Sequence, residues 1–249
     1  MEKISAVIIA GNEEKNILDC LESVRWADEI VVVNSESKDR TVEIARRYTD
    51  KVFVRKWEGY ASQKRFAASK ASNAWVLSLD ADERVSPELK EEIAHLDFSE
   101  ADGFFIPRRN YFLNKVITTC GWSPDYQMRL FLNSKTRMNE RIVHESFVVN
   151  GKTSHLKGEI IHYTHMSITE TMEKANDFST LSAVEKESRR KVKGRHIFFL
   201  PVYAFFHHFI MRRGFMDGVH GLMVSMIHAA TNLQTQLKIW ERQNVRDGR

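Results

Sequence analysis

The sequence predicts an α/β fold with a mixed, mainly parallel sheet, flanking helices and a C-terminal helical extension. In roughly the first hundred residues, short apolar runs of strand length alternate with segments whose apolar residues recur at helical spacing. Such alternation is typical of parallel strands joined by helices that cover both faces of the sheet. The chain after Ser167 instead shows long helical patterns and a dense aromatic run. We therefore expect two domains, residues 1–166 and residues 167–249.

The first part of the sheet is expected to contain four strands with a helix after each of the first three. The expected strands are Ile4–Ala10, Glu29–Asn34, Lys51–Arg55 and Trp75–Leu79. The expected helices are Glu14–Arg25, Thr41–Tyr48 and Ser62–Lys70. Apolar runs of this kind, rather than alternating ones, indicate strands that are buried on both faces.

The pattern changes after Ser86 and Pro87, which form a favourable N-cap and first-turn pair. A helix is expected there, and then strands of a mixed sheet with irregular links. The helix is Glu88–Leu96, and the strands are Gly103–Pro107, Gln127–Leu132, His144–Val149 and Glu159–Thr164. Ser167 and Glu170 then form a capping box that starts a long helix to about Lys193.

Length and composition restrict the class of protein. A chain of 249 residues with 43% hydrophobic and 28% charged residues suits one large domain with an appendage and excludes a disordered chain. Cys20 and Cys120 lie far apart with no CxxC spacing, which argues against a disulfide scaffold or a thiolate metal cluster and favours a reducing cytosol. The N-terminus lacks a basic region and a long apolar run, so we expect a first strand there and not a signal peptide.

Positive charge is concentrated near the C-terminus. Residues 180–249 contain 12 Lys and Arg against 5 Asp and Glu, whereas the whole chain has a formal charge of only +4. The aromatic run Ile197–Met211 is interrupted by Pro201 and is shorter than the ~20 apolar residues that a membrane-spanning helix needs.

Cations flank this run on both sides, and the helix expected after it carries an apolar stripe. These features favour an element that lies in the interface of an anionic membrane. Packing against the main domain or a second subunit is the alternative. Binding of nucleic acid is disfavoured because the aromatic residues do not alternate with cations.

Polar residues gather where a parallel sheet would bring them to one edge. Gly11–Glu14, Asn34–Arg40 and Asp80–Glu83 each follow an expected strand, and ligands of such sheets bind beyond the carboxyl ends of the strands. Asp80 and Asp82 can hold Mg²⁺ or Mn²⁺, which bridges the oxygens of a diphosphate. An acidic turn without a metal is the alternative. The absence of GxxxxGKS/T and GxGxxG patterns argues against ATP-loop and dinucleotide-binding proteins.

Four motifs in order, SAVIIAGNEE, EIVVVNSESKDRT, QKRFAASKA and WVLSLDADE, resemble those of family 2 glycosyltransferases with the GT-A fold. The later stretches IPRRNYFL, GWSPDYQMRLF, RIVHES, LKGEIIHYTH and RRGFMDGVHG are similar to a narrower branch. That branch contains bacterial lipopolysaccharide-core glucosyltransferases that add a sugar to an inner-core heptose. The resemblance covers nearly the whole chain. It implies a Mg²⁺- or Mn²⁺-dependent, inverting transfer of a hexose from UDP-glucose or a related UDP-hexose to a lipid-linked saccharide.

The resemblance implies which residues border the nucleotide. Ala10, Asn12 and Glu13 stand where the loop after the first strand borders uridine and ribose. Asn34 stands where many members have an Asp that bonds uracil, and its amide can still pair with the base edge. Asp39 occupies the usual Asp of the second loop, although capping of the following helix is an equal alternative.

Further positions correspond to the diphosphate and metal sites of the family. Lys64 matches a basic position near the diphosphate. Asp80 is expected near the ribose and the metal, and Asp82 is expected to bind the metal directly. Glu83 is expected to support these ligands or the neighbouring backbone.

An inverting transfer needs a general base beside the acceptor hydroxyl. The family places a carboxylate a few residues before an Arg, which assigns Asp125 as the base, with Glu145 as the second candidate. An ordinary turn role for Asp125 after Pro124 is the alternative. Gln127 and Arg129 are expected to order the acceptor or the diphosphate, although Arg129 as a surface partner of a carboxylate is equally open.

Arg108 and Arg109 are candidates for binding an anionic acceptor such as a phosphorylated heptose, with a solvated hairpin as the alternative. Three histidines, His144, His162 and His165, lack the HxxxH spacing of a helical zinc site. Structural histidines are the commoner case, and one of the three completing the metal shell is the less favoured interpretation.

The acceptor is the least determined part of the hypothesis. Polyprenyl phosphate, a capsular glycan or a protein side chain are alternatives to the heptose. The expected location is the cytoplasm, at the inner face of the cell membrane, and a homodimer is left open. A sugar-binding module without activity would explain the fold but not the paired carboxylates together with a candidate base.

Overall fold

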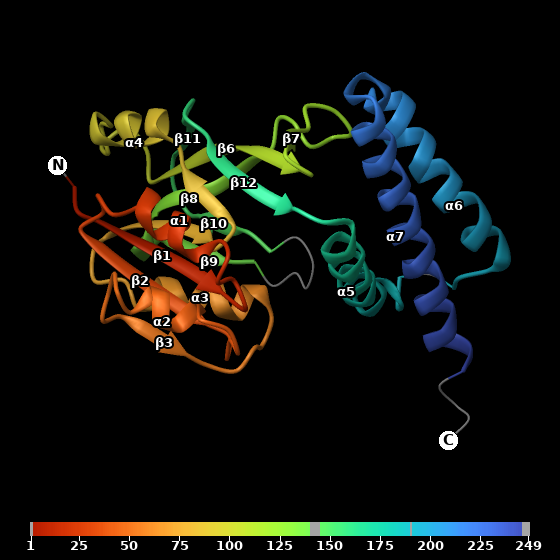
Figure 1. Ribbon diagram of the computed structural model, residues 1–249, viewed down its shortest axis with the longest axis horizontal. Coiled ribbons are helices and arrows are strands. Elements are labelled where there is room, and N and C mark those ends of the chain that lie inside the picture. Colours follow the sequence, from red (N-terminus) through yellow and green to blue (C-terminus); the bar gives the residue numbers. More distant parts are fainter. Residues whose placement is uncertain (1, 140–144, 190, 246–249) are drawn as a thin grey trace. The chain divides into compact units, whose positions relative to one another are not determined.

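The computed structural model describes residues 2–139, 145–189 and 191–245 (Figure 1). The chain divides into two compact units. The first comprises Met1–Arg109 and Asp125–His162, and the second comprises Asn110–Pro124 and Tyr163–Arg249. The segment 110–124 therefore groups with the C-terminal helices, although it lies in the middle of the sheet-forming part of the sequence.

The first unit is built on a mixed sheet whose N-terminal part is parallel, as the sequence predicts. Its parallel strands are β1 (Ile4–Ala10), β2 (Glu29–Asn34), β3 (Val52–Val54) and β4 (Trp75–Asp80). The remaining strands of the ordered path are β8 (Tyr126–Leu132), β6 (Gly103–Phe112), β12 (Ile160–His165) and β5 (Glu83–Val85). The strand order is β3-β2-β1-β4-β8-β6-β12-β5, and β8 runs antiparallel to both β4 and β6.

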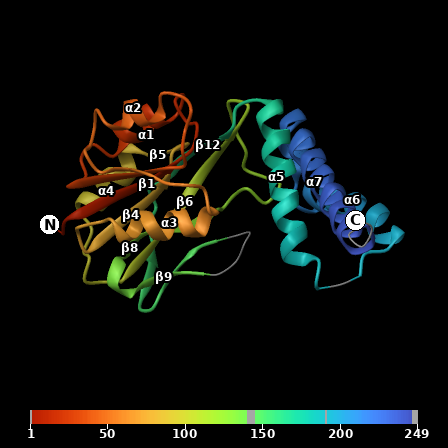
Figure 2. The ribbon, with the colours of Figure 1, turned by 90° about the horizontal axis from the view of Figure 1, so that it is seen from below.

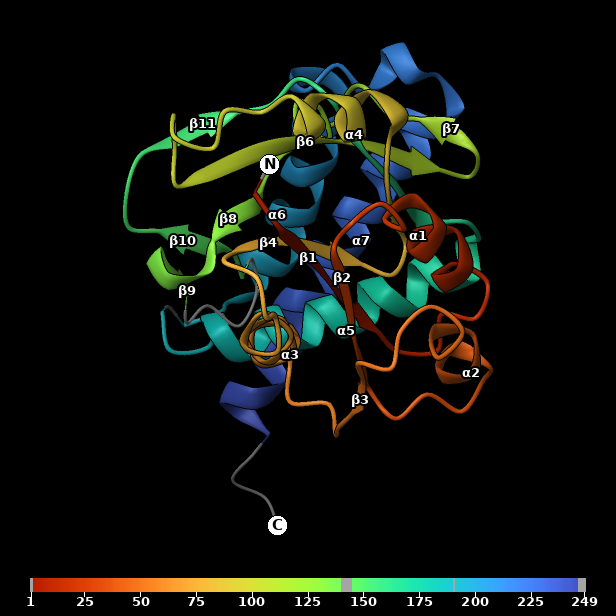
Figure 3. The same cartoon turned by 90° about the vertical axis from the view of Figure 1, so that its left-hand side faces the viewer.

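Helices cover both faces of this sheet (Figures 2 and 3). They are α1 (Ile17–Ser23), α2 (Thr41–Ala45), α3 (Tyr60–Ser69) and α4 (Pro87–Ala94). Successive side chains of β1 point to opposite faces, so Ala6 and Ile8 join one apolar core with α1 and α4. Val7 and Ile9 join a second core with α3. Burial on both faces explains why the strand is almost uniformly apolar.

Helix α4 begins as predicted. The Ser86 hydroxyl accepts a hydrogen bond from Leu89 N at 3.1 Å, and Pro87 occupies the first turn, where no N–H is needed. Four short strands complete the sheets: β7 (Lys115–Val116), β9 (Thr136–Met138), β10 (Phe147–Val149) and β11 (Thr153–His155). The strand predicted from His144 is observed as β10, and residues 140–144 lie outside the described residues.

The second unit is mainly helical. Its helices are α5 (Ile168–Lys186), α6 (Gly194–Phe206) and α7 (Val219–Asn244), and a π-helical turn (His207–Met211) and a 3₁₀ turn (Gly214–Asp217) separate the last two. Ser167 caps α5 as predicted, but the helix ends at Lys186 and not near Lys193. None of the described helices is both long enough and apolar enough to cross a bilayer.

Candidate active site

The sheet brings the predicted polar segments together at the carboxyl ends of its parallel strands. Ala10 at the end of β1 is in register with Asn34 at the end of β2, and Ile9 is in register with Asp80 at the end of β4. Because these strands are parallel, the loops after them lie at the same end of the strands. The predicted nucleotide and metal residues therefore lie in neighbouring loops at that end.

The loops after β1 and β2 are braced against each other by the predicted nucleotide-binding residues. Asn34 is fully buried, and its side chain accepts a hydrogen bond from Ser37 N and donates one to Ser37 Oγ. Asn12, with a φ of 55°, accepts a hydrogen bond from Lys38 N, and Glu13 N donates to Thr41 Oγ1. These contacts fix the two loops, while nucleotide contact by Asn12, Glu13 and Asn34 stays a prediction.

Asp39 also holds this pair of loops. Its carboxylate accepts hydrogen bonds from Glu14 N at 3.0 Å and from Thr41 N at 3.1 Å. Burial works against the charged form, but the hydrogen bonds from Thr41 and Glu14 keep the pKa of Asp39 below its ordinary value. The contact with Thr41, the first residue of α2, fits the alternative in which Asp39 caps that helix.

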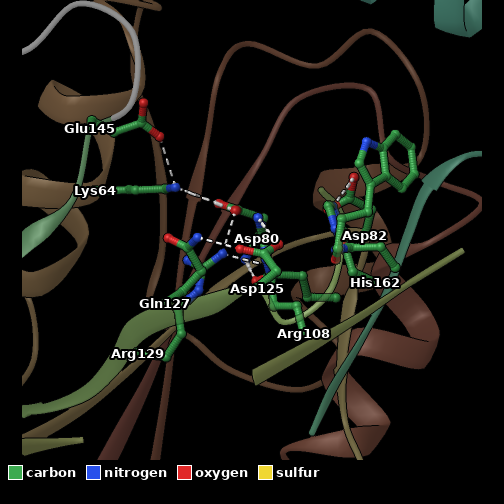
Figure 4. Close-up of polar contacts among 12 residues, drawn as sticks. Lys64, Asp80, Asp82, Arg108, Asp125, Gln127, Arg129, Glu145 and His162 are labelled. Carbon is green, nitrogen blue, oxygen red and sulfur yellow. Dashed lines mark hydrogen bonds and ion pairs between the residues drawn. The ribbon is translucent and has the colours of Figure 1, made fainter. Parts of the chain in front are cut away.

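A charged network lies at the end of β4 (Figure 4). Lys64 Nζ, from α3, lies 3.2 Å from Asp80 Oδ1 and 3.0 Å from Glu145 Oε1. Arg129 Nη2, from β8, donates to Asp80 Oδ2 at 2.8 Å. Side chains from α3 and β8 thus converge on Asp80. Arg129 is a partner of carboxylates, as the alternative had it, but it is not at the surface, because its side chain is only 5% exposed.

Glu83 is the buried centre of the network, and its partners could not be read from the sequence. Its side chain is completely buried, accepts hydrogen bonds from Arg108 and Arg129, and accepts another from Asp80 N at 2.9 Å. The sequence predicts that Glu83 supports the metal ligands or the neighbouring backbone, and the bond from Asp80 N fits the second of these. The two arginines come from β6 and β8, so their approach depends on strand order and register.

Asp125, at the entrance to β8, is held by two neighbours. Arg108 Nε donates to its Oδ2 at 2.9 Å, and Gln127 Nε2 donates to its Oδ1 at 2.7 Å. Arg108 N also donates to the Asp125 carbonyl at 2.8 Å. Arg108 therefore links Asp125 to Glu83.

Asp82 has surroundings different from those of Asp80. Its side chain is 13% exposed, and its Oδ2 lies 3.6 Å from His162 Nε2, which comes from β12. His144 lies outside the described residues, and His165 is the last residue of β12. Arg109 forms an ion pair with Glu159 and is 43% exposed, so it is separate from the pairs formed by Arg108.

Comparison with known proteins decides the family. The sequence profile of glycosyl transferase family 2 matches residues 5–155. The chain belongs to glycosyl transferase family 2. A Rickettsia felis glycosyltransferase is 33% identical over 262 residues, which cover 97% of this chain and 90% of that protein. The lipopolysaccharide core biosynthesis glycosyltransferase LpsC of Rhizobium meliloti is 30% identical over 249 residues, which cover 96% of this chain and 92% of LpsC.

Among solved structures, Staphylococcus aureus TarS 1-349 in complex with UDP-GlcNAc matches 99% of this glycosyltransferase and 92% of that chain, with a TM-score of 0.49 and 16% identity. The family membership and the mixed sheet with flanking helices confirm the family and fold class that the sequence predicts.

Opposite charges dominate the electrostatics of this glycosyltransferase's network. Burial disfavours the charged form of Asp80, but the Lys64 and Arg129 cations outweigh it and hold the pKa of Asp80 well below its ordinary value. Desolvation likewise opposes the charge of Arg129, but Glu83 and Asp80 raise the pKa of its guanidinium. Asp80 and Arg129 therefore stay charged across ordinary pH values.

The residues at the end of β4 fit a divalent cation that completes its shell with substrate oxygens. Asp82 and His162 supply an oxygen and a nitrogen donor 3.6 Å apart, and Asp80 Oδ1 is buried with no hydrogen bond beside its ion pair with Lys64. In the described part of the chain, no group of three or more His, Cys, Asp or Glu side chains is arranged to hold a metal alone. Mg²⁺ is commonly bound through one or two carboxylates together with substrate phosphates, which suits this donor set.

Proposed function

We propose that this protein is an inverting hexosyltransferase that moves glucose, or a related hexose, from UDP to a heptose of the lipopolysaccharide inner core. The observation that carries the proposal is the joining of Lys64, Asp80, Arg129 and Asp125 in one network at the carboxyl ends of the strands. Similarity to LpsC, over 92% of that protein, supports an acceptor in the lipopolysaccharide core.

The cations of this network, Lys64 and Arg129, suit the diphosphate of the donor. Lys64 and Arg129 neutralise Asp80 in the structure, and both side chains are suited to phosphate oxygens. Asp82, with Asp80 and His162 beside it, would hold a divalent cation. When bound, that cation would neutralise the negative charge that develops on the departing diphosphate. Lys64 and Arg129 would stabilise the same charge from fixed positions.

Asp125 is the proposed general base. Arg108 and Gln127 fix the orientation of its carboxylate, and the side chain remains 20% exposed. Asp125 accepts the proton of the acceptor hydroxyl while the hydroxyl oxygen forms a bond to the anomeric carbon. The bond from that carbon to the phosphate oxygen breaks, and UDP leaves with the electron pair. Attack on the face opposite the leaving group inverts the anomeric centre.

Glu145 is the second candidate for the base. Its Oε1 accepts from Lys64, which also pairs with Asp80, so Glu145 belongs to the donor side of the network. The Oδ1 atom of Asp125 instead accepts from the neutral amide of Gln127. An acceptor hydroxyl replaces that bond at a lower cost than an ion pair with a buried Lys, which favours Asp125.

The acceptor is proposed to carry negative charge. Arg109 is partly exposed on β6, directly after Arg108, and forms an ion pair with Glu159. A guanidinium donates two parallel hydrogen bonds to a phosphate, so Arg109 suits a phosphorylated heptose.

We also propose that the second unit attaches this glycosyltransferase to the inner face of the cytoplasmic membrane as a peripheral protein. No residue of α6 is buried, and Phe198 and Phe199 are 66% and 64% exposed. Exposed aromatic side chains beside cations are typical of helices that lie in the interface of an anionic bilayer. The cations next to this face in sequence are Lys193, Arg195, Arg212 and Arg213.

The decisive experiment incubates the purified full chain with UDP-glucose, Mg²⁺ or Mn²⁺, and lipopolysaccharide truncated at the inner-core heptose, with and without heptose phosphate. We expect release of UDP, a gain of one hexose in the mass spectrum of the core, and a faster reaction with the phosphorylated acceptor. Transfer to polyprenyl phosphate but not to the truncated core would overturn the acceptor. Failure to consume any UDP-hexose in a donor screen would overturn the donor class.

A further inference from the structure

The RRGFMDGVHG motif lies outside the network described above, yet its residues make closely fitted contacts within the second unit. It forms the turn between α6 and α7, where Arg213 has a φ of 55° and Gly218 a φ of 63°. A Cβ at Gly221 would lie 1.8 Å from Gly214 O, and a Cβ at Gly214 would lie 2.7 Å from Cys120 Sγ. The turn therefore needs glycine at these positions, and it packs directly against the segment 110–124.

Asp217 is the polar centre of that contact. Its side chain is 8% exposed, and its Oδ2 accepts hydrogen bonds from Thr118 N and Thr119 N, both at 3.0 Å, and from Thr119 Oγ1 at 2.7 Å. Lys115 Nζ donates to the Asp217 carbonyl at 2.7 Å. One carboxylate oxygen thus holds three donors of a loop that is about 100 residues away in sequence.

Two further contacts from the C-terminal helices continue along the same segment. Cys120 N donates to Arg212 O at 3.0 Å, and His208 Nδ1 lies 2.8 Å from Cys120 O. Trp122 Nε1 donates to His228 Nε2 at 3.2 Å. Together with the bonds of Asp217, these contacts hold the segment from Thr118 to Trp122, which lies two positions before Pro124.

The ends of this segment are attached to the proposed base. The segment begins directly after Arg109, within β6, and ends directly before Asp125, and Arg108 bonds to both the backbone and the side chain of Asp125. The segment 110–124 is covalently joined to Arg109 at one end and to Asp125 at the other, so a change in its backbone can reach the Arg108–Asp125 pair through the chain. Small displacements of a catalytic group lower turnover strongly, even when the altered residue is remote.

We infer that Asp217 is a positioning residue of this glycosyltransferase, which holds the segment 110–124 and thereby orients Asp125 toward the acceptor hydroxyl. The inference rests on the proposed function of Asp125 as the base. The proposed role of Asp217 involves no contact with substrate or reacting atoms. It acts through Thr118 and Thr119.

The test compares the full-length wild-type chain with Asp217→Asn, Thr119→Val, Thr119→Ser and Asp177→Asn. An Asn side chain cannot accept three hydrogen bonds with a full charge, and Val keeps the shape of Thr while losing the hydroxyl. Ser retains the hydroxyl, so Thr119→Ser is the conservative rescue variant. Asp177 is an exposed carboxylate on α5 and serves as the matched control.

Hydrogen exchange of peptides that cover residues 115–122, UDP affinity, and kcat with a saccharide acceptor are measured for each variant. Asp217→Asn is expected to speed exchange in this segment and to lower kcat by about tenfold with unchanged UDP affinity. Thr119→Val should give a smaller loss in the same direction, while Thr119→Ser and Asp177→Asn match the wild type. The loss of kcat in the double variant Asp217→Asn/Thr119→Val should be smaller than the combined losses of the two single variants, because both changes break the same hydrogen bond.

Faster exchange with unchanged turnover in Asp217→Asn would overturn the positioning role. Equal loss of UDP affinity and turnover would overturn it as well, because that pattern indicates general loss of structure. If Asp217→Asn does not fold, the Thr119→Val and Thr119→Ser pair decides, since it leaves Asp217 in place. If the wild-type chain transfers no hexose, the proposed function fails on its own, and unchanged exchange in Asp217→Asn would then overturn the holding of the segment.

Discussion

Three carboxylates within four residues of this glycosyltransferase have three different sets of partners. Asp80 is paired with Lys64 and Arg129, and Glu83 is buried between two arginines. Asp82 lies beside His162, with its Oδ2 3.6 Å from His162 Nε2. Because Lys64 and Arg129 already neutralise Asp80, we expect Asp82 to be the primary metal ligand and Asp80 to support it.

Replacement of Asp82 tests this division. Asp82→Asn keeps the volume of the side chain but removes the charge, so metal-stimulated transfer should fall by about 100-fold. Turnover as a function of Mn²⁺ concentration measures the effect, and circular dichroism checks the fold. Asp50→Asn, at an exposed position of the first unit, is the control and should behave as the wild type. Undiminished metal stimulation in Asp82→Asn would remove Asp82 from the proposed metal site.

Replacement of the two candidate bases separates their roles. Asp125→Asn cannot accept the proton of the acceptor, so kcat should fall by roughly 10²–10⁴-fold while UDP affinity stays near that of the wild type. Glu145→Gln should lower turnover less and should weaken UDP binding, because it alters the partner of Lys64. Steady-state kinetics and UDP calorimetry provide the two readouts. If Glu145→Gln instead showed the large loss of kcat with unchanged UDP affinity, the base would be Glu145.

Residue types and their order predicted most members of the site, but not their pairing. Asp80 follows from the rule that ligands bind at the carboxyl ends of parallel strands, whereas Lys64 and Asp125 follow from the resemblance to family 2 glycosyltransferases. The contacts of Glu83 and the Arg109–Glu159 pair depend on how β5, β6, β8 and β12 are aligned. Local sequence contains no record of that alignment, because the strands meet only through tertiary packing.

At the scale of elements, the start of β2 is fixed by a single carboxylate. Glu29 forms an ion pair with Lys51 and accepts hydrogen bonds from Ser5 Oγ at 2.5 Å and Ser72 N at 2.7 Å. Burial opposes its charge, but these donors lower the pKa of Glu29 from 4.5 to about 2. Glu29 thereby ties β2 to β1 and to the turns before β3 and β4.

Stability should therefore depend on pH through Glu29. A carboxylate whose pKa is lowered by folding stabilises the protein above its unfolded pKa, and this contribution is lost as the pH falls through the folded value. The free energy of unfolding of the wild type should exceed that of Glu29→Gln by about 1–3 kcal/mol at neutral pH. The difference should narrow between pH 4.5 and about 2. Urea denaturation over a pH series measures it, with the exposed Glu43→Gln as control, and a pH-independent difference would contradict the prediction.

The parallel strands were the most predictable elements, and the elements whose extent depends on tertiary contacts were the least. β1 and β2 match their expected bounds because an apolar run buried on both faces is readable without tertiary information. β6 instead extends to Phe112, five residues past the expected Pro107, since Tyr111 and Phe112 pair with β7. The segment 110–124 groups with the C-terminal helices through contacts with residues that are distant in sequence, such as Asp217 and His228.

At the scale of the whole molecule, positive charge and exposed aromatic surface belong to the same part of the chain. Residues 180–249 contain most of the cationic excess, and α6 with the turns after it contains many exposed large apolar side chains. The exposed residues include Phe198, Phe199, Tyr203, Phe206, Met211 and Phe215. Burial of a Phe side chain contributes roughly 1.5–3 kcal/mol, so even two of them affect partition to a bilayer strongly. The charges add an attraction that salt screens.

Flotation with anionic liposomes separates these contributions. Phe198→Ser/Phe199→Ser removes exposed side chains and should lower the floated fraction of the full chain at least about tenfold without loss of thermal stability. Trp57→Ser/Tyr60→Ser removes two aromatic side chains of the first unit that are 44% and 47% exposed, and it is the matched control. Added salt should weaken flotation of the wild type, and neutral liposomes should recover less protein. If both double variants floated equally, the exposed aromatic side chains of α6 would not be the membrane-binding surface. Loss of stability or of a dimer in the Phe variant would instead indicate that this face packs against protein, which was the alternative to a membrane.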